Sequence, residues 1–443
     1  MKFKKKARFL SRLFFYCIII LLYNNFMNQT EAGPILTSDG IPLKVSLKKA
    51  ERINKFRAFL LVLPLLAFIL LTFLVPIGDM LARSIDDRQI NTVFPKTFEV
   101  YKKWDQQGLP SEELYATMFF EVKNSEGYDI GKASTRMNYS KSGWKSLLKK
   151  SKRKFKKIEE GPYKEQMIAA EKRWGDIEYW KALGQMVDPT TMGYYLNAVD
   201  LKYDSSKNIV QQKENRRIYN KTWFKTFKVS VLVTFFCLIL AYPISYLLAT
   251  LPLKYSNLLM ICVLLPFWTS LLVRTVAWMV MLQQKGVFNN LMVMAGLIAD
   301  ENRWQLMYNQ TAVVIVMTQI LLPFMVLPLY SVMKTISPNY MRAALNLGAS
   351  PLHAFYKIYM PNSIPGVSAG CLLVFIIAIG YYITPELVGG KDGQMVGNWI
   401  AYHLKTTLNW GLCASLGAIL LAVMTVLYWA YNKIVGIENI KLG

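Results

Sequence analysis

Residues 337–351 read SPNYMRAALNLGASP, a polar and basic stretch that lies between two long apolar runs. Ser337 can cap a helix whose first residue is Pro338, and Gly348 suits the left-handed backbone position that ends a helix. The stretch therefore predicts one short capped helix inside a loop between two apolar segments.

A second short helix is predicted directly after the first. Ser350 and Pro351 repeat the start signal, and Pro361 and Pro365 are expected to stop this helix before the next apolar run begins. Two short capped helices in one loop form a rigid projection. Such a projection is suited to transmit force from a soluble partner.

Composition indicates a polytopic helical membrane protein. The chain has 443 residues, of which 53% are hydrophobic, and the apolar residues gather in runs near twenty residues long. The net charge of +24 then reports the loop charges that set topology, and no zinc spacing or RNA motif accompanies it, so nucleic acid is not an expected partner. His353 and His403 stand alone in the sequence, so no metal site is predicted.

We expect an all-α fold with six transmembrane helices, each long enough to cross a hydrocarbon core of ~30 Å. The predicted spans are residues 57–78, 227–250, 257–282, 311–333, 364–384 and 410–431. The corresponding organisation is an N-terminal extension and tail (1–56), a first membrane helix (57–81), an insert (82–226), a membrane core (227–435) with the loop 334–363, and a tail (436–443).

Loop charges predict the orientation. Six basic residues between Lys44 and Arg57 precede the first span, which places the amino side in the cytoplasm. An even number of spans returns the C-terminus to the cytoplasm. Residues 13–23 form a signal-like apolar run, but a span there would invert every later loop. We therefore expect residues 1–26 to be an upstream extension or a dispensable tail, with Met27 as a possible start.

The insert at residues 82–226 is long enough to be a domain, and the topology places it outside the cytoplasm. Helices are expected from Glu112 and over residues 163–183, with Trp144, Trp174 and Trp180 in a modest core. Its most basic stretch is residues 145–157. Two interpretations stay open: a structural cap with a solvated basic face, or a docking surface for an acidic binding protein or lipid headgroups.

No motif for catalysis is visible in the sequence. The nearest phosphate-loop likeness, Gly389-Gly390-Lys391-Asp392, lacks the upstream glycine, where Pro385 stands, and lacks Ser or Thr after the lysine. We therefore expect a protein that is not an enzyme and that binds no cofactor directly.

Arg274 lies inside the predicted third span, eight residues after Pro266. A charge at that depth costs roughly 2.5–3.5 kcal/mol or more unless it is paired or hydrated, so it should face the bundle interior. It either lines a pathway or braces two helices through an ion pair, with Glu386 or Asp79 as candidate partners.

The loop resembles the coupling loop of binding-protein-dependent ABC importer permeases, whose pattern is E-A-A, then G, then I-x-L-P. The matching residues are Arg342, Ala343, Ala344, Gly348, Ile358 and Pro361, with Arg342 in place of the glutamate and Met360 in place of the leucine. The resemblance implies an ATP-using importer whose ATPase subunits contact this loop.

Further segments resemble permeases of the spermidine/putrescine importers. They are residues 274–279, 322–330 and 380–390. The resemblance implies a permease subunit in the bacterial inner membrane that pairs with a second permease, two cytoplasmic ATPase subunits and a periplasmic substrate-binding protein. A different small substrate stays open, as does an ATPase-independent secondary transporter.

A cationic substrate would be held by carboxylates and aromatic faces. Glu386 is the candidate carboxylate, with Tyr381, Tyr382 and Trp399 near it in sequence and Trp268 on another span. The alternative for these aromatic residues is an interfacial belt, which Trp and Tyr form in most membrane proteins.

Overall fold

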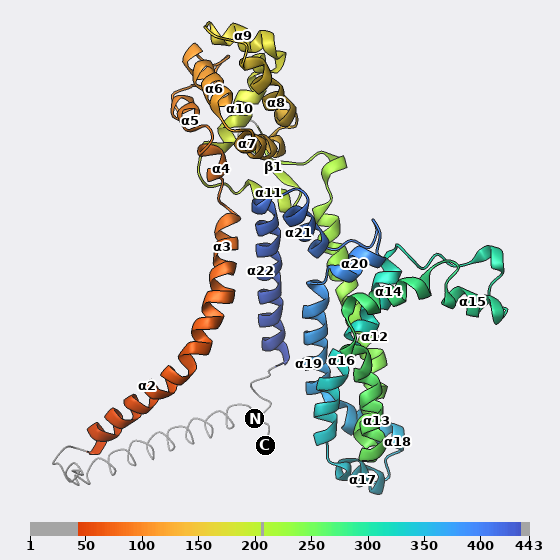
Figure 1. The fold of residues 1–443 in the computed structure, drawn as a ribbon. Helices are drawn as coiled ribbons and strands as arrows, with labels where there is room; N and C mark the ends of the chain where they lie inside the picture. The colour runs from red at the N-terminus through yellow and green to blue at the C-terminus, as the bar shows by residue number, and fades with distance from the viewer. Residues whose placement is uncertain (1–42, 205–207, 436–443) are drawn as a thin grey trace, which may run out of the picture. The chain divides into compact units, whose positions relative to one another are not determined.

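The computed structural model describes residues 43–204 and 208–435 (Figure 1). The signal-like run and residues 1–26 lie outside the described residues. The chain divides into two units, residues 1–78 and 79–443.

The all-α membrane fold is confirmed. Five helices in the described part are long and apolar enough to cross a membrane, and a sixth span is present if one bent helix pair counts as one. The five are Ala50–Arg83, Tyr219–Thr250, Gln310–Thr335, Pro351–Ile379 and Trp410–Lys433, and the bent pair is Leu253–Trp268 with Leu271–Met294.

The first apolar helix consists of α2 (Leu43–Ile69), a π-turn η1 (Leu70–Leu74) and α3 (Val75–Arg83). The π-turn ends two residues before Pro76, which has no backbone N–H to continue a regular ladder. Thr72 Oγ1 donates to the carbonyl of Phe68 at 2.6 Å within the same helix. The predicted span 57–78 lies inside this helix.

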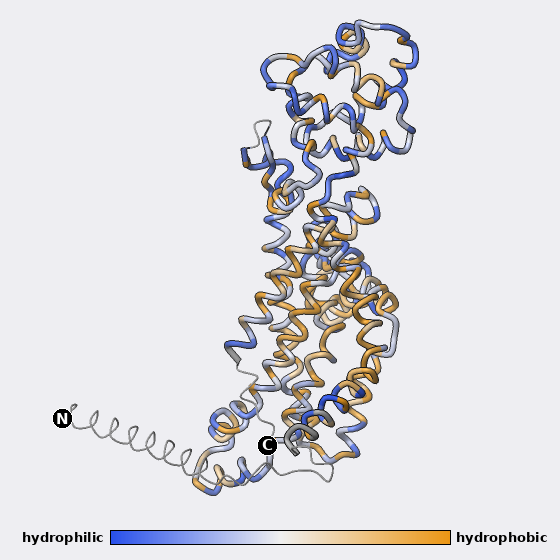
Figure 2. The backbone as a smooth tube through the Cα atoms, turned by 90° about the vertical axis from the view of Figure 1, so that its left-hand side faces the viewer, coloured by the Kyte–Doolittle hydropathy of each residue, from blue (hydrophilic) through white to orange (hydrophobic). Residues whose placement is uncertain are grey.

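Three long helices form the centre of the second unit: α12 (Tyr219–Thr250), α16 (Gln310–Thr335) and α19 (Met360–Ile379). Gly366 and Gly370 let α19 approach α16 closely, because a Cβ at Gly366 would lie 3.2 Å from the Cα of Leu329. This four-residue spacing of small residues is the usual device for tight helix contact in membranes. Figure 2 shows these helices as mainly hydrophobic.

The predicted third span differs from the structure. Instead of one helix over 257–282, the chain forms α13 (Leu253–Leu264), the 3₁₀ turn η5 (Leu265–Trp268) and α14 (Leu271–Leu282), and the helix pair bends by 95°. Pro266 cannot donate to the helical ladder, and Thr269 is extended, so the helix breaks here. The segment continues as α15 (Val287–Met294) and η6 (Asp300–Asn302).

The prediction that Pro361 and Pro365 stop the helix is also wrong. One helix runs over Pro351–Ile379, through α18 (Pro351–Ala354), a π-turn η7 (Phe355–Tyr359) and α19. Pro361 falls in the first turn after the π-turn, where a missing N–H is tolerated. The predicted span 364–384 therefore begins earlier and ends at Ile379.

The insert is helical and has its own core. Trp144, Trp174 and Trp180 are fully buried, which confirms the predicted tryptophan core. The predicted helix from Glu112 is α6, whereas the helix expected over 163–183 is broken by η2. The elements are α4 (Arg88–Asn91), α5 (Pro95–Tyr101), α6 (Glu112–Asn124), α7 (Gly127–Ser140), α8 (Trp144–Phe155), α9 (Tyr163–Ala170), η2 (Lys172–Gly175), α10 (Ile177–Leu183), η3 (Gly184–Met186), α11 (Gly193–Ala198), β1 (Leu201–Tyr203), β2 (Ile209–Gln211) and η4 (Glu214–Arg216).

Candidate functional site

The loop after α16 forms the two predicted short helices, α17 (Pro338–Asn346) and α18. Ser337 Oγ accepts from the N–H of Asn339, and Ser350 Oγ accepts from the N–H of His353, each at 3.3 Å. Gly348 has φ +85°, the left-handed conformation that its position requires. The two start signals and the glycine stop are confirmed.

The hairpin presents an exposed face that combines charge and apolar surface. Arg342 and Ala343 are exposed, whereas Ala344 is buried. The Arg342 side chain has no hydrogen bond or ion pair with any residue that the structure describes. Leu347 and Leu352 are 89% and 73% exposed, and with the exposed Leu345 they give the hairpin an apolar surface of the kind that another protein covers.

Aromatic side chains join the hairpin to the membrane core. The rings of Phe355 and Tyr359 stack with centroids 5.6 Å apart, and Tyr246 of α12 meets Tyr359 edge-on at 5.0 Å. Tyr242 and Ser363 lie 3.0 Å apart between their hydroxyl oxygens. Ile358 and Pro361 flank this cluster. A displacement of the hairpin therefore acts on both α12 and α19.

At the opposite end of α19, two short helices hold the candidate carboxylate (Figure 1): α20 (Ile383–Val388) and α21 (Val396–Lys405). Glu386 is exposed, and its Oε2 accepts a hydrogen bond from Asn398 Nδ2 at 2.6 Å. Asn398 is buried and also donates to the carbonyl of Tyr382 at 2.9 Å. The carboxylate is thus oriented by a fixed amide while it remains open to solvent.

The structure separates the candidate aromatic residues. Tyr382 lies beside Asn398, and the ammonium of Lys405 lies 5.6 Å from its ring centroid. Trp399 packs instead on His403 and Tyr219, with ring centroids 6.2 and 6.0 Å away. Trp268 is 73% exposed at the break before α14, and its side chain contacts no ring in the described residues. Tyr382 stays near Glu386, whose backbone N–H donates to its carbonyl at 3.0 Å, whereas Tyr381 packs against the membrane core.

Arg274 lies in α14, which contacts α20. Its Nε and Nη1 atoms are buried and have no hydrogen-bond partner among the described residues. The two partners considered from the sequence are engaged elsewhere, because Glu386 bonds Asn398 and Asp79 pairs with Arg83 at 2.7 Å. Burial raises the pKa of the Tyr381 hydroxyl, and the nearby Arg274 charge opposes this shift.

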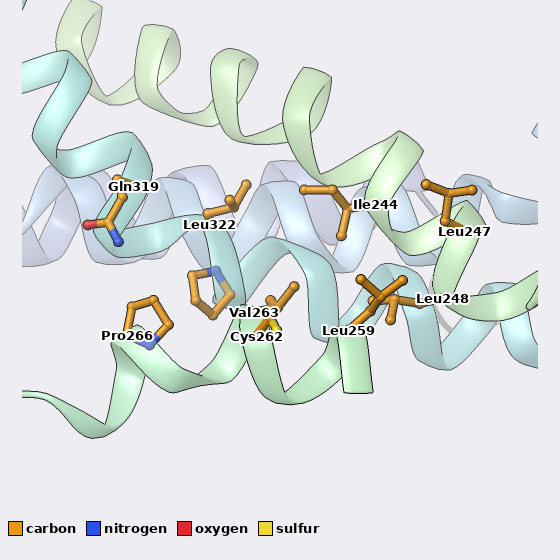
Figure 3. Close-up of a pocket in the computed structure, with 10 residues that line it drawn as sticks. Ile244, Leu247, Leu248, Leu259, Cys262, Val263, Pro266, Gln319 and Leu322 are labelled. Carbon is orange, nitrogen blue, oxygen red and sulfur yellow. The ribbon is translucent and has the colours of Figure 1, made fainter. Parts of the chain in front are cut away.

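A cavity of about 360 Å³ lies between α12, α13 and α16 (Figure 3). Gln319 is the one lining residue with a polar side chain apart from Cys262, and its Oε1 accepts from Trp278 Nε1 at 3.1 Å. No carboxylate lines this cavity, so it offers no site for a cation. No sequence pattern predicts this cavity, because its lining comes from three helices that are separated in the chain.

The fold defines a polytopic helical membrane protein with a capped helical hairpin at one end of its bundle. A profile of the family described as "Binding-protein-dependent transport system inner membrane component" matches residues 222–435. A spermidine/putrescine transport system permease protein, PotB, of Haemophilus influenzae is 33% identical over 220 residues, which cover 49% of this chain and 76% of PotB. The chain belongs to this family of inner-membrane transport components.

Other relatives agree with this membership. PotB of Escherichia coli K12 is 34% identical over 220 residues, covering 49% of this chain and 79% of that protein. The inner-membrane ABC transporter permease YdcU of the same organism is 28% identical, covering 48% and 70%. All of these proteins are permeases by name, and the chain is likewise a multi-pass inner-membrane permease.

Two solved structures were also similar. A bacterial alginate ABC transporter with its periplasmic protein has 16% identity and a TM-score of 0.42, covering 50% of this chain and 79% of that one. The methionine transporter MetNI has 17% identity and a TM-score of 0.38, covering 49% and 94%.

Proposed function

We propose that this chain is the permease subunit of an ATP-driven importer that carries putrescine and spermidine across the inner membrane. The observation that carries the substrate class is the identity of 33–34% to spermidine/putrescine permeases over at least three quarters of their length. The exposed carboxylate of Glu386, oriented by Asn398, supports it, since an ammonium group is bound by a carboxylate through a charge-assisted hydrogen bond.

The same proposal assigns the partners. A second permease subunit completes the pathway, two cytoplasmic ATPase subunits bind the hairpin of α17 and α18, and a periplasmic binding protein delivers the substrate. ATP is bound and used by the partner subunits. Both termini then lie in the cytoplasm, and the insert lies in the periplasm.

The residues of the hairpin couple the ATPase to the membrane helices through their contacts on both sides. The exposed Arg342 and Ala343 meet the ATPase, Gly348 sets the turn that follows their helix, and the Phe355–Tyr359 ring pair passes the movement to α12 and α19. Loaded binding protein and ATP together favour the outward-facing state, so each must bind that state better than the inward one. Arg342, in place of the family glutamate, supplies a cation for a carboxylate of the ATPase.

Uptake in cells tests the proposal. Labelled putrescine and spermidine are offered to cells that lack this gene, with and without its restoration. Restored uptake that stops when ATP is depleted is the expected result. Uptake that remains absent after restoration, while the protein is still bound to an ATPase, would contradict the proposed substrate class. It would not contradict the assignment of the chain as a permease subunit of an importer.

A further inference from the structure

The insert carries a basic face on α8 that the permease fold does not explain. It lies outside residues 222–435, the part that matches the family. We define the basic face as five of the exposed cations of α8 and its C-terminal end: Lys145, Lys149, Arg153, Lys156 and Lys157. Residues at four-residue spacing share one side of a helix, which gathers these charges together.

The opposite side of α8 is fixed in the core of the insert. Trp144, Leu147, Leu148 and Phe155 are fully buried, and Trp174 Nε1 donates to Ser151 Oγ at 2.8 Å. The helix cannot rotate to hide its charges. The basic face is therefore a permanent feature of the surface.

The cations of the basic face are left unpaired by the described residues. The neighbouring Lys150 and Lys154 lie 3.7 and 3.9 Å from Glu171, and Lys152 donates to a backbone carbonyl. By contrast, the side chains of the basic face have no ion pair or hydrogen bond in the described part of the chain. Like charges at four-residue spacing destabilise a helix, so the arrangement costs the insert stability.

The helix dipole explains only the cations near the C-terminal end of α8. Cations at the C-terminal end of a helix, such as Arg153 in the last turn of α8 and Lys156 at its C-cap, are favourable there. Lys145 stands in the first turn of α8, which has no acidic residue, and a cation is unfavourable at that end. The two lysines in the first half, Lys145 and Lys149, therefore point to an external anionic partner.

The insert is fixed to the end of the core opposite the coupling hairpin. Ser415 Oγ donates to the carbonyl of Tyr194 at 3.1 Å, and Trp223 Nε1 donates to the carbonyl of Ala198 at 3.0 Å. Both bonds join α11 of the insert to membrane helices, α22 (Trp410–Val435) and α12. A protein that docks on the basic face is thus held above the periplasmic end of the pathway.

We propose that the basic face docks an acidic surface of the substrate-binding protein of the same transport system. The inference rests on the proposed function, because a soluble protein that holds a polyamine needs carboxylates around its cleft. Complementary charge steers such a protein toward the permease and mainly raises its association rate. This contact adds to the contacts that the permease core, residues 222–435, makes with the binding protein.

The test compares two triple variants of the assembled transporter in nanodiscs of neutral lipid. One is Lys145→Glu, Lys149→Glu and Arg153→Glu in the basic face. The matched control is Lys102→Glu, Lys103→Glu and Lys213→Glu, exposed lysines of the insert outside that face. Association of the binding protein is measured by surface plasmon resonance at ~20 and ~200 mM salt, a range over which screening changes severalfold.

We expect the basic-face variant to lower the association rate at low salt at least tenfold, and to flatten its salt dependence. The control should leave both within about twofold. Equal rates for the two variants would overturn the proposal. So would an unchanged rate together with loss of binding to phosphatidylglycerol vesicles, since the surface would then recognise lipid. If polyamine uptake fails but the basic-face variant still lowers the association rate, the docking proposal is supported and only the proposed substrate class is contradicted.

Discussion

The carboxylate of Asp200 accepts a hydrogen bond from the backbone N–H of Tyr219 at 3.0 Å, at the first residue of α12. The same carboxylate accepts from the N–H groups of Ile218 and Asn220, at 3.0 and 2.8 Å. Asp200 is only 2% exposed. The last part of the insert thus closes the amino end of a membrane helix, where backbone donors lack partners and a negative charge is favourable.

Replacing this cap should weaken the joint between the end of the insert and the amino end of α12. Asp200 has φ +60°, so Asp200→Ala loses the three bonds and also places alanine in an unfavourable backbone region. We expect a loss of about 2 kcal/mol, seen as a lower midpoint of thermal unfolding in detergent. Asp200→Asn, which tolerates the same φ and keeps one acceptor oxygen, should lose less than half of that. Equal midpoints for wild type and Asp200→Ala would contradict the role of this cap.

His403 predicts a pH dependence at the same joint. Its Nε2 lies 2.8 Å from the Tyr219 hydroxyl and its Nδ1 lies 2.9 Å from Thr407 Oγ1. Burial lowers the pKa of His403 to about 4. In the unfolded chain the pKa is near 6.5, so the unfolded state binds more protons between these values. The free energy of unfolding should therefore fall as pH is lowered from about 6.5 to about 4.

His403→Gln removes the titrating group while it keeps polar atoms. Its thermal midpoint should change less than that of wild type over the same pH interval. Parallel pH profiles of the two proteins would show that other groups, and not His403, carry the effect.

Gly348 should set the geometry of the coupling hairpin. No atom lies within 4 Å of a Cβ built there, so a side chain would meet open space and only the backbone is strained. Valine at φ +85° costs about 1–2 kcal/mol, which asparagine largely avoids. We expect Gly348→Val to lower substrate-stimulated ATP hydrolysis of the assembled transporter about tenfold, and Gly348→Asn to retain most of it. Equal losses would indicate that the side chain, and not the turn, matters.

Glu386 should determine affinity for the cation. Glu386→Gln keeps an acceptor for Asn398 but removes the charge, and a hydrogen bond to a charged group contributes about 1.5–3 kcal/mol. The KM for spermidine uptake should rise roughly 10- to 100-fold. The exposed Glu301 offers a matched control, because Glu301→Gln makes the same change away from the site. An unchanged KM in Glu386→Gln would contradict a role of this residue in binding the substrate.

Local signals made the coupling hairpin predictable. Ser337, Ser350 and Gly348 act through backbone groups within a few residues, so a reading of the sequence suffices. Five of the six predicted spans were predictable for a similar reason, since length and apolar composition decide whether a helix can cross a membrane. The exposed or buried state of Arg342 and its neighbours then follows from helix periodicity.

Features that depend on distant parts of the chain could not be predicted. Hydropathy runs unbroken through Pro266 and Thr269, so it gave no sign of the 95° bend. Pro361 is a helix stop by local rules, yet a π-turn and the ring contacts of Phe355 with α12 keep the helix intact. The Glu386–Asn398 bond joins two helices across a loop, and Asp200 reaches α12 from 19 residues away. Such pairings need the tertiary fold.

Transport by the purified complex tests the central claim most directly. The chain is reconstituted into proteoliposomes with its second permease, its ATPase subunits at the inner face of the hairpin, and its binding protein on the opposite side. Labelled spermidine is then followed with ATP or with a non-hydrolysable analogue in the ATPase compartment. The account predicts accumulation against a gradient that needs both ATP and the binding protein. Accumulation without ATP, or ATP hydrolysis that the loaded binding protein does not stimulate and that moves no polyamine, would contradict it.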